Sequence, residues 1–147
     1  MPAISFDEEW LDPLLSSTKQ TTTRPLKNQL PRLKIGDIVS IYNQQREPKH
    51  TKALRLEHNP GHITSFDFAH LLGKVEIIEV TRFEPLLIEI EALNTWARKD
   101  GFKNFDAANE WFTKKYNGLW MYYPWVVYSW DGWLERYFEP KQQKRGQ

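Results

Sequence analysis

Two strand-like stretches constrain the fold more than any other feature of this chain. In IGDIVSIY, residues 35–42, apolar residues point to both faces of the expected strand, which is typical of a strand buried on both sides. LLGKVEIIEV, residues 71–80, alternates apolar and polar residues, with a shift in the pattern near Ile78. In a chain of 147 residues, these strands favour a small closed or nearly closed β-barrel over an open α/β sheet.

Helical patterns lie on either side of these strands. Ser5 and Glu8 match a capping box before an apolar pattern that runs from Phe6 to Leu15, with a kink expected at Pro13. Helices are expected over residues 90–99, with Ile90, Leu93 and Ala97 on the buried face, and after Asn104 as N-cap, with Phe105, Ala108, Phe112 and Tyr116 on one face. WVVYSW, residues 125–130, predicts a last strand, and loops are expected over 17–34 and 47–68. The predicted fold class is α+β, a small β-barrel with flanking helices.

Composition limits the classes of function. We expect one domain over residues 1–140 and a flexible basic tail over 141–147. Twenty Lys and Arg against 19 Asp and Glu leave a net charge of +1, so a nucleic-acid partner would have to meet a local basic patch. The sequence has no Cys, which excludes disulfides and thiolate chemistry. An acidic start and the lack of a long apolar run predict a cytoplasmic protein with no membrane partner.

Histidines raise the question of a metal site, but their spacing argues against one. His58, His62 and His70 lie near Asp67, yet Pro60-Gly61 prevents a helix from joining the first two. We therefore expect no metal and no cofactor.

The stretch STKQTTTRP, residues 17–25, carries the side chains best suited to chemistry. Lys19 precedes Thr22 by three residues, so an amine can lie beside a hydroxyl, and a neutral amine could take the proton of that hydroxyl. Arg24 adds a planar donor for a carboxylate, a phosphate or a carbonyl. The alternative is a solvated loop without function.

The order of several motifs resembles the ASCH domain, a small β-barrel family related to the PUA fold of RNA-modifying enzymes. Members carry K-x-x-T-x-R, then a strand that opens with G-D, a G-x-V-x-I-x-x-V strand, and a helix that ends in A-x-x-D/E-G-F. The matching segments here are Lys19 to Arg24, Gly36-Asp37, GKVEIIEV, and ARKDGF at residues 97–102. FDAANEWFTKKY takes the place of the second helix, so the resemblance covers about residues 6–130.

The resemblance implies two kinds of activity. Some small bacterial members are amidohydrolases that remove the acyl group of N4-acetylcytidine, which implies Thr22 as nucleophile, Lys19 as base and Asp100 as the orienting acid. This chain has aspartate where those enzymes have glutamate, and Thr23 where a hydrophobic residue is usual. The family is also supposed to bind RNA or nucleotides, and some members have been proposed to act as ribonucleases.

The binding hypothesis adds residues outside the motif. A nucleoside or RNA pocket would use Arg24, Thr21, Lys27 and Arg32, with Tyr42 and Trp125 as stacking rings. A third hypothesis is a protein-interaction module or homodimer that uses the aromatic segment 119–130. RNA or nucleotide binding is favoured over both the amidohydrolase and the interaction module.

Overall fold

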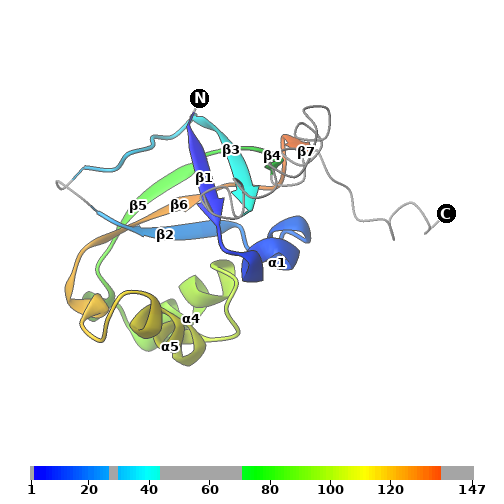
Figure 1. Cartoon of the computed structure of the whole chain (residues 1–147). Coiled ribbons are helices and arrows are strands. Elements are labelled where there is room, and N and C mark those ends of the chain that lie inside the picture. The colour runs from blue at the N-terminus through cyan, green and yellow to red at the C-terminus, as the bar shows by residue number, and fades with distance from the viewer. Residues whose placement is uncertain (1, 27–29, 44–70, 137–147) are drawn as a thin grey trace, which may run out of the picture.

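The strands of this protein form two sheets, with helices packed at one end (Figure 1). The computed structural model describes residues 2–26, 30–43 and 71–136.

The first sheet has the strand order β1-β3-β4-β7, formed by β1 (Ala3–Phe6), β3 (Ile38–Asn43), β4 (Leu71–Glu76) and β7 (Glu135–Arg136). The second has the order β2-β6-β5, formed by β2 (Thr21–Pro25), β6 (Trp125–Ser129) and β5 (Glu79–Phe83). β1 and β3 are parallel and all other pairs are antiparallel. The predicted α+β class is confirmed.

The chain passes from one sheet to the other at Ile77-Ile78, between β4 and β5. The Ile77 N–H donates to the Asp37 carbonyl at 2.9 Å, and the Ile78 N–H donates to the Ser129 carbonyl at 2.8 Å. Ile77 is fully buried and Ile78 is 49% exposed. The strand predicted over residues 71–80 is therefore two strands, and the shift in its apolar pattern marks the corner.

The N-terminal prediction is wrong in part. Residues 3–6 form β1, where Ser5 pairs with Tyr42, and the helical segment starts later, as the 3-10 turn η1 (Glu8–Trp10) and α1 (Leu11–Leu15). The N-cap of η1 is Asp7, and no side chain caps it, so the predicted capping box does not form. The parallel pairing with β3 outweighs the local helical signal.

The loop predicted over residues 17–34 is also wrong in part, because Thr21–Pro25 form β2, the edge strand next to β6. Threonine is β-branched and suits a strand. The three threonines are buried, so the strand has no apolar alternation by which it could be recognised.

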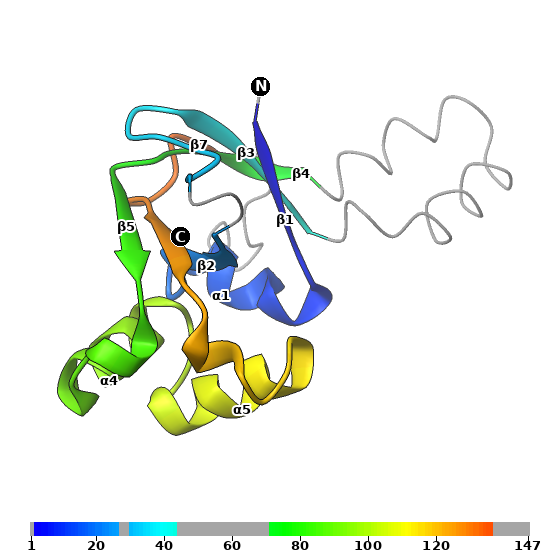
Figure 2. The ribbon, with the colours of Figure 1, turned by 90° about the vertical axis from the view of Figure 1, so that its left-hand side faces the viewer.

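Both later helices are confirmed, as α4 (Ile90–Lys99) and α5 (Phe105–Lys115). The Asn104 side chain accepts the Ala107 N–H at 2.9 Å, so the predicted N-cap is present. Ile90 is 57% exposed, contrary to expectation, and Trp96 is buried on α4 instead. Figure 2 shows both helices beneath the end of the second sheet.

Two apolar cores hold these layers together. One includes Val39 and Val75 of the first sheet and Tyr128 of the second. The other packs rings of α4 and α5 against β6, and its Phe112 and Trp120 stack with centroids 4.6 Å apart. Trp120 belongs to the 3-10 turn η4 (Trp120–Tyr122), which contacts the 3-10 turn η3 (Pro85–Leu87). Much of the aromatic content therefore serves the core.

Several predictions fall on residues outside the described ranges. These are Lys27, the loop over residues 47–68 with its histidines, His70, and the tail over 141–147. Of the helices within the described ranges, none has both the length and the apolarity of a membrane span.

Candidate functional site

A cleft opens between the end of β1, strand β2 and helix α5. It encloses about 400 Å³, including the part open to solvent. Its lining comes from four parts of the chain: the N-terminal segment (Ser5, Phe6, Asp7 and Trp10), β2 and the residues before it (Lys19, Thr22, Thr23 and Arg24), the end of α4 (Asp100), and the end of α5 (Trp111, Phe112, Lys115 and Tyr116).

Asp100 meets Lys19 at the end of α4. The Asp100 N–H closes the helix on the Trp96 carbonyl at 3.0 Å, so its own carbonyl is left without a helical partner. Lys19 Nζ donates to that carbonyl at 2.7 Å and lies 3.5 Å from Asp100 Oδ2. A cation at a helix C-terminus is also favoured by the helix dipole.

Two threonines on β2 hold the other carboxylate oxygen of Asp100. Thr21 Oγ1 donates to Asp100 Oδ1 at 2.5 Å, and Thr23 Oγ1 donates to the same atom at 3.3 Å. The Trp96 indole donates to Thr23 Oγ1 at 2.8 Å. Because an indole N–H can only donate, the hydrogen of Thr23 is left for Asp100. The buried carboxylate thus has a partner on each oxygen.

Lys19 is enclosed by rings and by the backbone of Gly101. Its side chain is 3% exposed, and Nζ lies 4.4 Å from the Trp10 ring centroid and 5.5 Å from that of Phe6. Gly101 has φ +100°, and a Cβ there would lie 2.8 Å from Trp10 Cζ3 and 3.3 Å from Lys19 Cβ. The glycine that follows Asp100 therefore allows the close packing of Lys19.

Burial and charge act in opposite directions on Lys19. Burial lowers the pKa of the Lys19 ammonium, Asp100 raises it, and the Arg24 charge lowers it again, with a net pKa below the ordinary value. The neutral amine is therefore more accessible at Lys19 than at an exposed lysine.

Thr22 and Arg24 lie on the face of β2 opposite Thr21 and Thr23, because side chains alternate along a strand. Arg24 Nε donates to Thr22 Oγ1 at 2.9 Å, and Nη2 donates to the Ser5 carbonyl of β1 at 3.1 Å. These two bonds use two of the five guanidinium N–H groups. Arg24 Cζ lies 5.1 Å from the Phe6 centroid, and burial lowers the pKa of Arg24.

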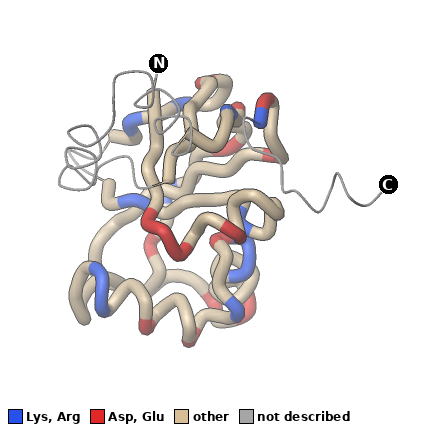
Figure 3. The backbone as a smooth tube through the Cα atoms, turned by 45° about the vertical axis from the view of Figure 1, so that its right-hand side comes forward, with Lys and Arg blue, Asp and Glu red and all other residues tan. Residues whose placement is uncertain are grey.

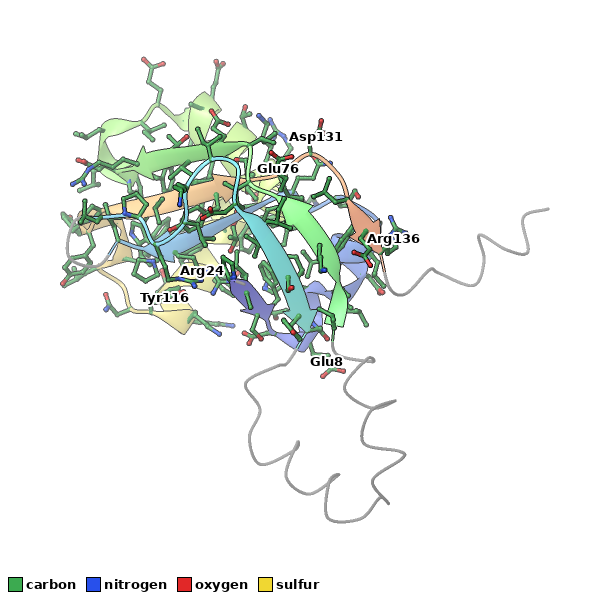
Figure 4. The ribbon with its side chains drawn as sticks, turned by 90° about the horizontal axis from the view of Figure 1, so that it is seen from above. Glu8, Arg24, Glu76, Tyr116, Asp131 and Arg136 are labelled. Atoms are coloured by element: carbon green, nitrogen blue, oxygen red, sulfur yellow. The ribbon has the colours of Figure 1, made fainter. Side chains whose placement is uncertain are left out.

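Two bridges link the N-terminal segment to α5 beside the cleft. Lys115 Nζ lies 2.6 Å from Asp7 Oδ2, and the Trp111 indole donates to Glu9 Oε2 at 2.6 Å. Tyr116, the C-cap of α5, lies on the same side of the molecule as Arg24, and Arg136 lies on the opposite side (Figure 4).

The structure brings together four of the residues predicted to form the site. Lys19, Thr22, Arg24 and Asp100 all line the cleft. Thr21 does not line the cleft, but its hydroxyl donates to the Asp100 carboxylate. The three residues of the family motif and the acid therefore share one small volume.

The other predicted binding residues lie elsewhere. Arg32 is exposed, and its guanidinium donates to the Ala3 carbonyl at 3.2 Å. Tyr42 is half-buried on β3 and does not line the cleft. Trp125 is 3% exposed and donates to the Trp120 carbonyl at 2.8 Å, so it offers no surface for stacking.

Sequence reasoning missed the rings of the cleft and the partners of Asp100. Trp10, Trp111 and Tyr116 come from segments whose pattern indicated helix only. Trp96 precedes Asp100 by four residues, so helical spacing could have placed the two together. Thr23 follows Thr21 by two residues, which would place both on one face once β2 is known to be a strand.

The charges of the cleft are unevenly paired. Lys19 is paired with Asp100, and Lys115 with Asp7. Within the described part of the chain, Arg24 forms no ion pair. The same part of the chain holds no group of three His, Cys, Asp or Glu that could bind a metal.

Comparison with solved structures identifies the fold. The chain is similar to ASCH from Zymomonas mobilis, with a TM-score of 0.53 and 11% identity over 97% of this chain and 76% of that chain. A serine-to-alanine variant of that protein gives a TM-score of 0.52, also at 11% identity and the same coverage. Protein EF3133 from Enterococcus faecalis gives 0.51 at 12% identity, over 92% of this chain and 71% of its own. No protein-family model and no curated protein matches the sequence.

These likenesses define the class: the chain has the PUA-like fold of ASCH-domain structures. The resemblance seen in the sequence motifs is thereby supported at the level of the fold.

Proposed function

We propose that this protein binds a nucleoside in the cleft, either free or as one residue of an RNA. Donors from Lys19, Thr22 and Arg24 face the same volume as the rings of Trp10 and Trp111. A nucleobase combines carbonyl acceptors on its edge with a flat face that packs on aromatic rings. The cleft therefore has the chemistry that a base requires.

Arg24 carries this proposal. It lines the cleft, and it is the one cation of that lining without an acidic partner among the described residues. Its N–H groups beyond the two bonded to Thr22 and Ser5 can donate to a carbonyl or an anionic oxygen.

The distribution of charge favours contact with a single nucleoside over a long RNA strand. In Figure 3, the lysines and arginines of the described residues form short separate stretches and not one basic strip. Asp7 and Glu9 lie at the cleft and would repel neighbouring phosphates. We therefore expect binding that depends only weakly on salt.

The test is a titration of the protein with cytidine, N4-acetylcytidine and a short cytidine-containing RNA. Binding is monitored by tryptophan fluorescence. Arg24→Gln should weaken binding by about tenfold or more, the usual effect of losing a hydrogen bond from a charged group. Arg82→Gln, an exposed arginine paired with Glu84, is the control and should bind as the wild type does. If no nucleoside gives saturable binding, or if Arg24→Gln binds normally, the proposal is wrong.

A second candidate function is hydrolysis of an acylated nucleoside, favoured by Lys19. Burial lowers the pKa of Lys19, which is paired with Asp100 and lines the same cleft as Thr22, and an amine must be neutral to act as a base. Thr22 Oγ would attack the acyl carbon as Lys19 takes its proton. The C–N bond then breaks as Lys19 returns the proton to the leaving amine, and water hydrolyses the ester on Thr22.

Arg24 would assist this step by donating one of its remaining N–H groups to the acyl oxygen, where negative charge develops as Thr22 attacks. The assay is release of cytidine from N4-acetylcytidine by wild type, Lys19→Met and Thr22→Val. Turnover that both substitutions abolish supports the hydrolase. Binding without turnover supports the binding function alone.

A further inference from the structure

We propose that the charge of Arg24 favours the neutral form of Lys19, so that Arg24 acts on the amine of the cleft as well as on the ligand. This inference rests on the proposed function only for its biological consequence. The relation between the two cations is a property of the protein without any ligand.

The geometry places both cations on one ring. Lys19 Nζ lies 5.5 Å and Arg24 Cζ 5.1 Å from the centroid of Phe6. Phe6 is 5% exposed and Lys19 is 3% exposed, so the repulsion between the two charges is screened less than it would be on an open surface. Both cations interact favourably with the ring and unfavourably with each other.

Arg24 is held in this place by bonds that do not involve Lys19. Its Nε donates to Thr22 and its Nη2 donates to the Ser5 carbonyl, which ties β2 to β1. A guanidinium remains charged at any physiological pH. Of the two cations, only Lys19 can relieve the repulsion by losing its proton.

The charged groups around Lys19 come from four elements. Asp100 at the end of α4 and Glu9 of η1 favour the ammonium, and Arg24 of β2 opposes it. Lys115 of α5 also lines the cleft, but it is paired with Asp7. Burial is the largest cause of the lowered pKa of Lys19, and Arg24 is the largest cause that comes from a single like charge.

The repulsion between Arg24 and Lys19 should make the binding of anionic ligands depend on pH. An anion that binds Arg24 offsets its charge and therefore favours the protonated form of Lys19. Binding of such a ligand would then take up a proton, and by linkage its affinity would fall as the pH rises. A neutral nucleoside would leave this equilibrium nearly unchanged.

The experiment is an NMR titration of Lys19 without ligand, on protein labelled at lysine 13Cε and assigned through the missing signal of Lys19→Arg. Arg24→Gln removes the charge and keeps an N–H donor at the position of Nε, the atom that bonds to Thr22. Arg24→Met is a second neutral variant, and Arg24→Lys keeps the charge. Arg32→Gln is the matched control, because Arg32 also donates to a carbonyl of β1, that of Ala3, but does not line the cleft.

We expect the titration midpoint of Lys19 to move upward in Arg24→Gln and Arg24→Met, and to stay near the wild-type value in Arg24→Lys and Arg32→Gln. An unchanged or lower midpoint in the neutral variants overturns the proposal. An equal rise in Arg24→Lys overturns it as well, because packing and not charge would then be the cause. Since no ligand is present, the result is independent of nucleoside binding, and either proposal can fail alone.

Discussion

Replacing Asp100 by Asn tests the electrostatics of the cleft through folding stability. The change keeps the size of the side chain but removes the charge that faces Lys19 Nζ at 3.5 Å. Both side chains are 3% exposed, so the ammonium would be left buried without its counter-ion. Breaking a buried ion pair in this way typically costs about 3–5 kcal/mol. For a domain of this size, that is a fall in Tm of roughly 10 °C or more.

The cost should depend on pH because Lys19 can lose its proton. Burial lowers the pKa of Lys19 in the wild type, and Asp100 opposes this effect, so Asp100→Asn lowers the pKa further. Where the folded protein binds fewer protons than the unfolded chain, stability rises with pH. The loss in Asp100→Asn should therefore be largest at low pH, where Lys19 is protonated in both folded proteins, and should shrink as the pH rises from the Lys19 pKa of the variant to that of the wild type.

The assay is urea unfolding of both proteins at pH 6, 7.5 and 9. Glu84→Gln is the control, because it removes a carboxylate from an exposed pair with Arg82 and should cost less than about 1 kcal/mol at every pH. If Asp100→Asn lowers the free energy of unfolding by less than about 1 kcal/mol, or by an amount that does not change with pH, Asp100 does not stabilise a buried ammonium at Lys19.

Three further substitutions test local features. Gly101→Ala should destabilise the protein by about 2 kcal/mol or more in urea unfolding, because its Cβ would lie 2.8 Å from Trp10 Cζ3 at a φ of +100°. Ser17→Gly should raise Tm, with a gain of about 1 kcal/mol, because Ser17 has φ 64° at the end of α1. Asn104→Ala should lower the free energy of unfolding by about 1 kcal/mol in the same assay, because it removes the cap that accepts the Ala107 N–H. For each of the three variants, an unfolding midpoint equal to that of the wild type would contradict the prediction.

Segments with a periodic apolar pattern could be predicted from the sequence. A strand whose buried side chains are polar could not. α4 matches the expected range because its apolar spacing and its end at Asp100-Gly101 are local signals. β2 was missed because its buried residues are threonines whose hydroxyls bond to Asp100 or accept from Arg24. Asp100 is distant in the sequence from Thr21 and Thr23, so no local pattern reveals these bonds.

Four polar or charged residues of the cleft lining were predicted from the sequence, and its aromatic residues were not. Lys19, Thr22, Arg24 and Asp100 were found because their spacing resembles a family motif. The rings were misassigned for a physical reason: tryptophan serves a core and a binding surface equally well. Trp125, expected to stack on a base, lies in the core, and Trp10 and Trp111, expected only as helical residues, line the cleft.

The most direct test of the central claim is an NMR titration of the tryptophan indole N–H signals with N4-acetylcytidine and cytidine. A nucleoside bound in the cleft should shift the signals of Trp10 and Trp111, which line it, and those of Trp125 and Trp130, which do not line it, should move much less. Arg24→Gln should reduce these shifts at the same ligand concentration. If the cleft indoles do not move while the protein stays folded, the cleft is not a nucleoside site.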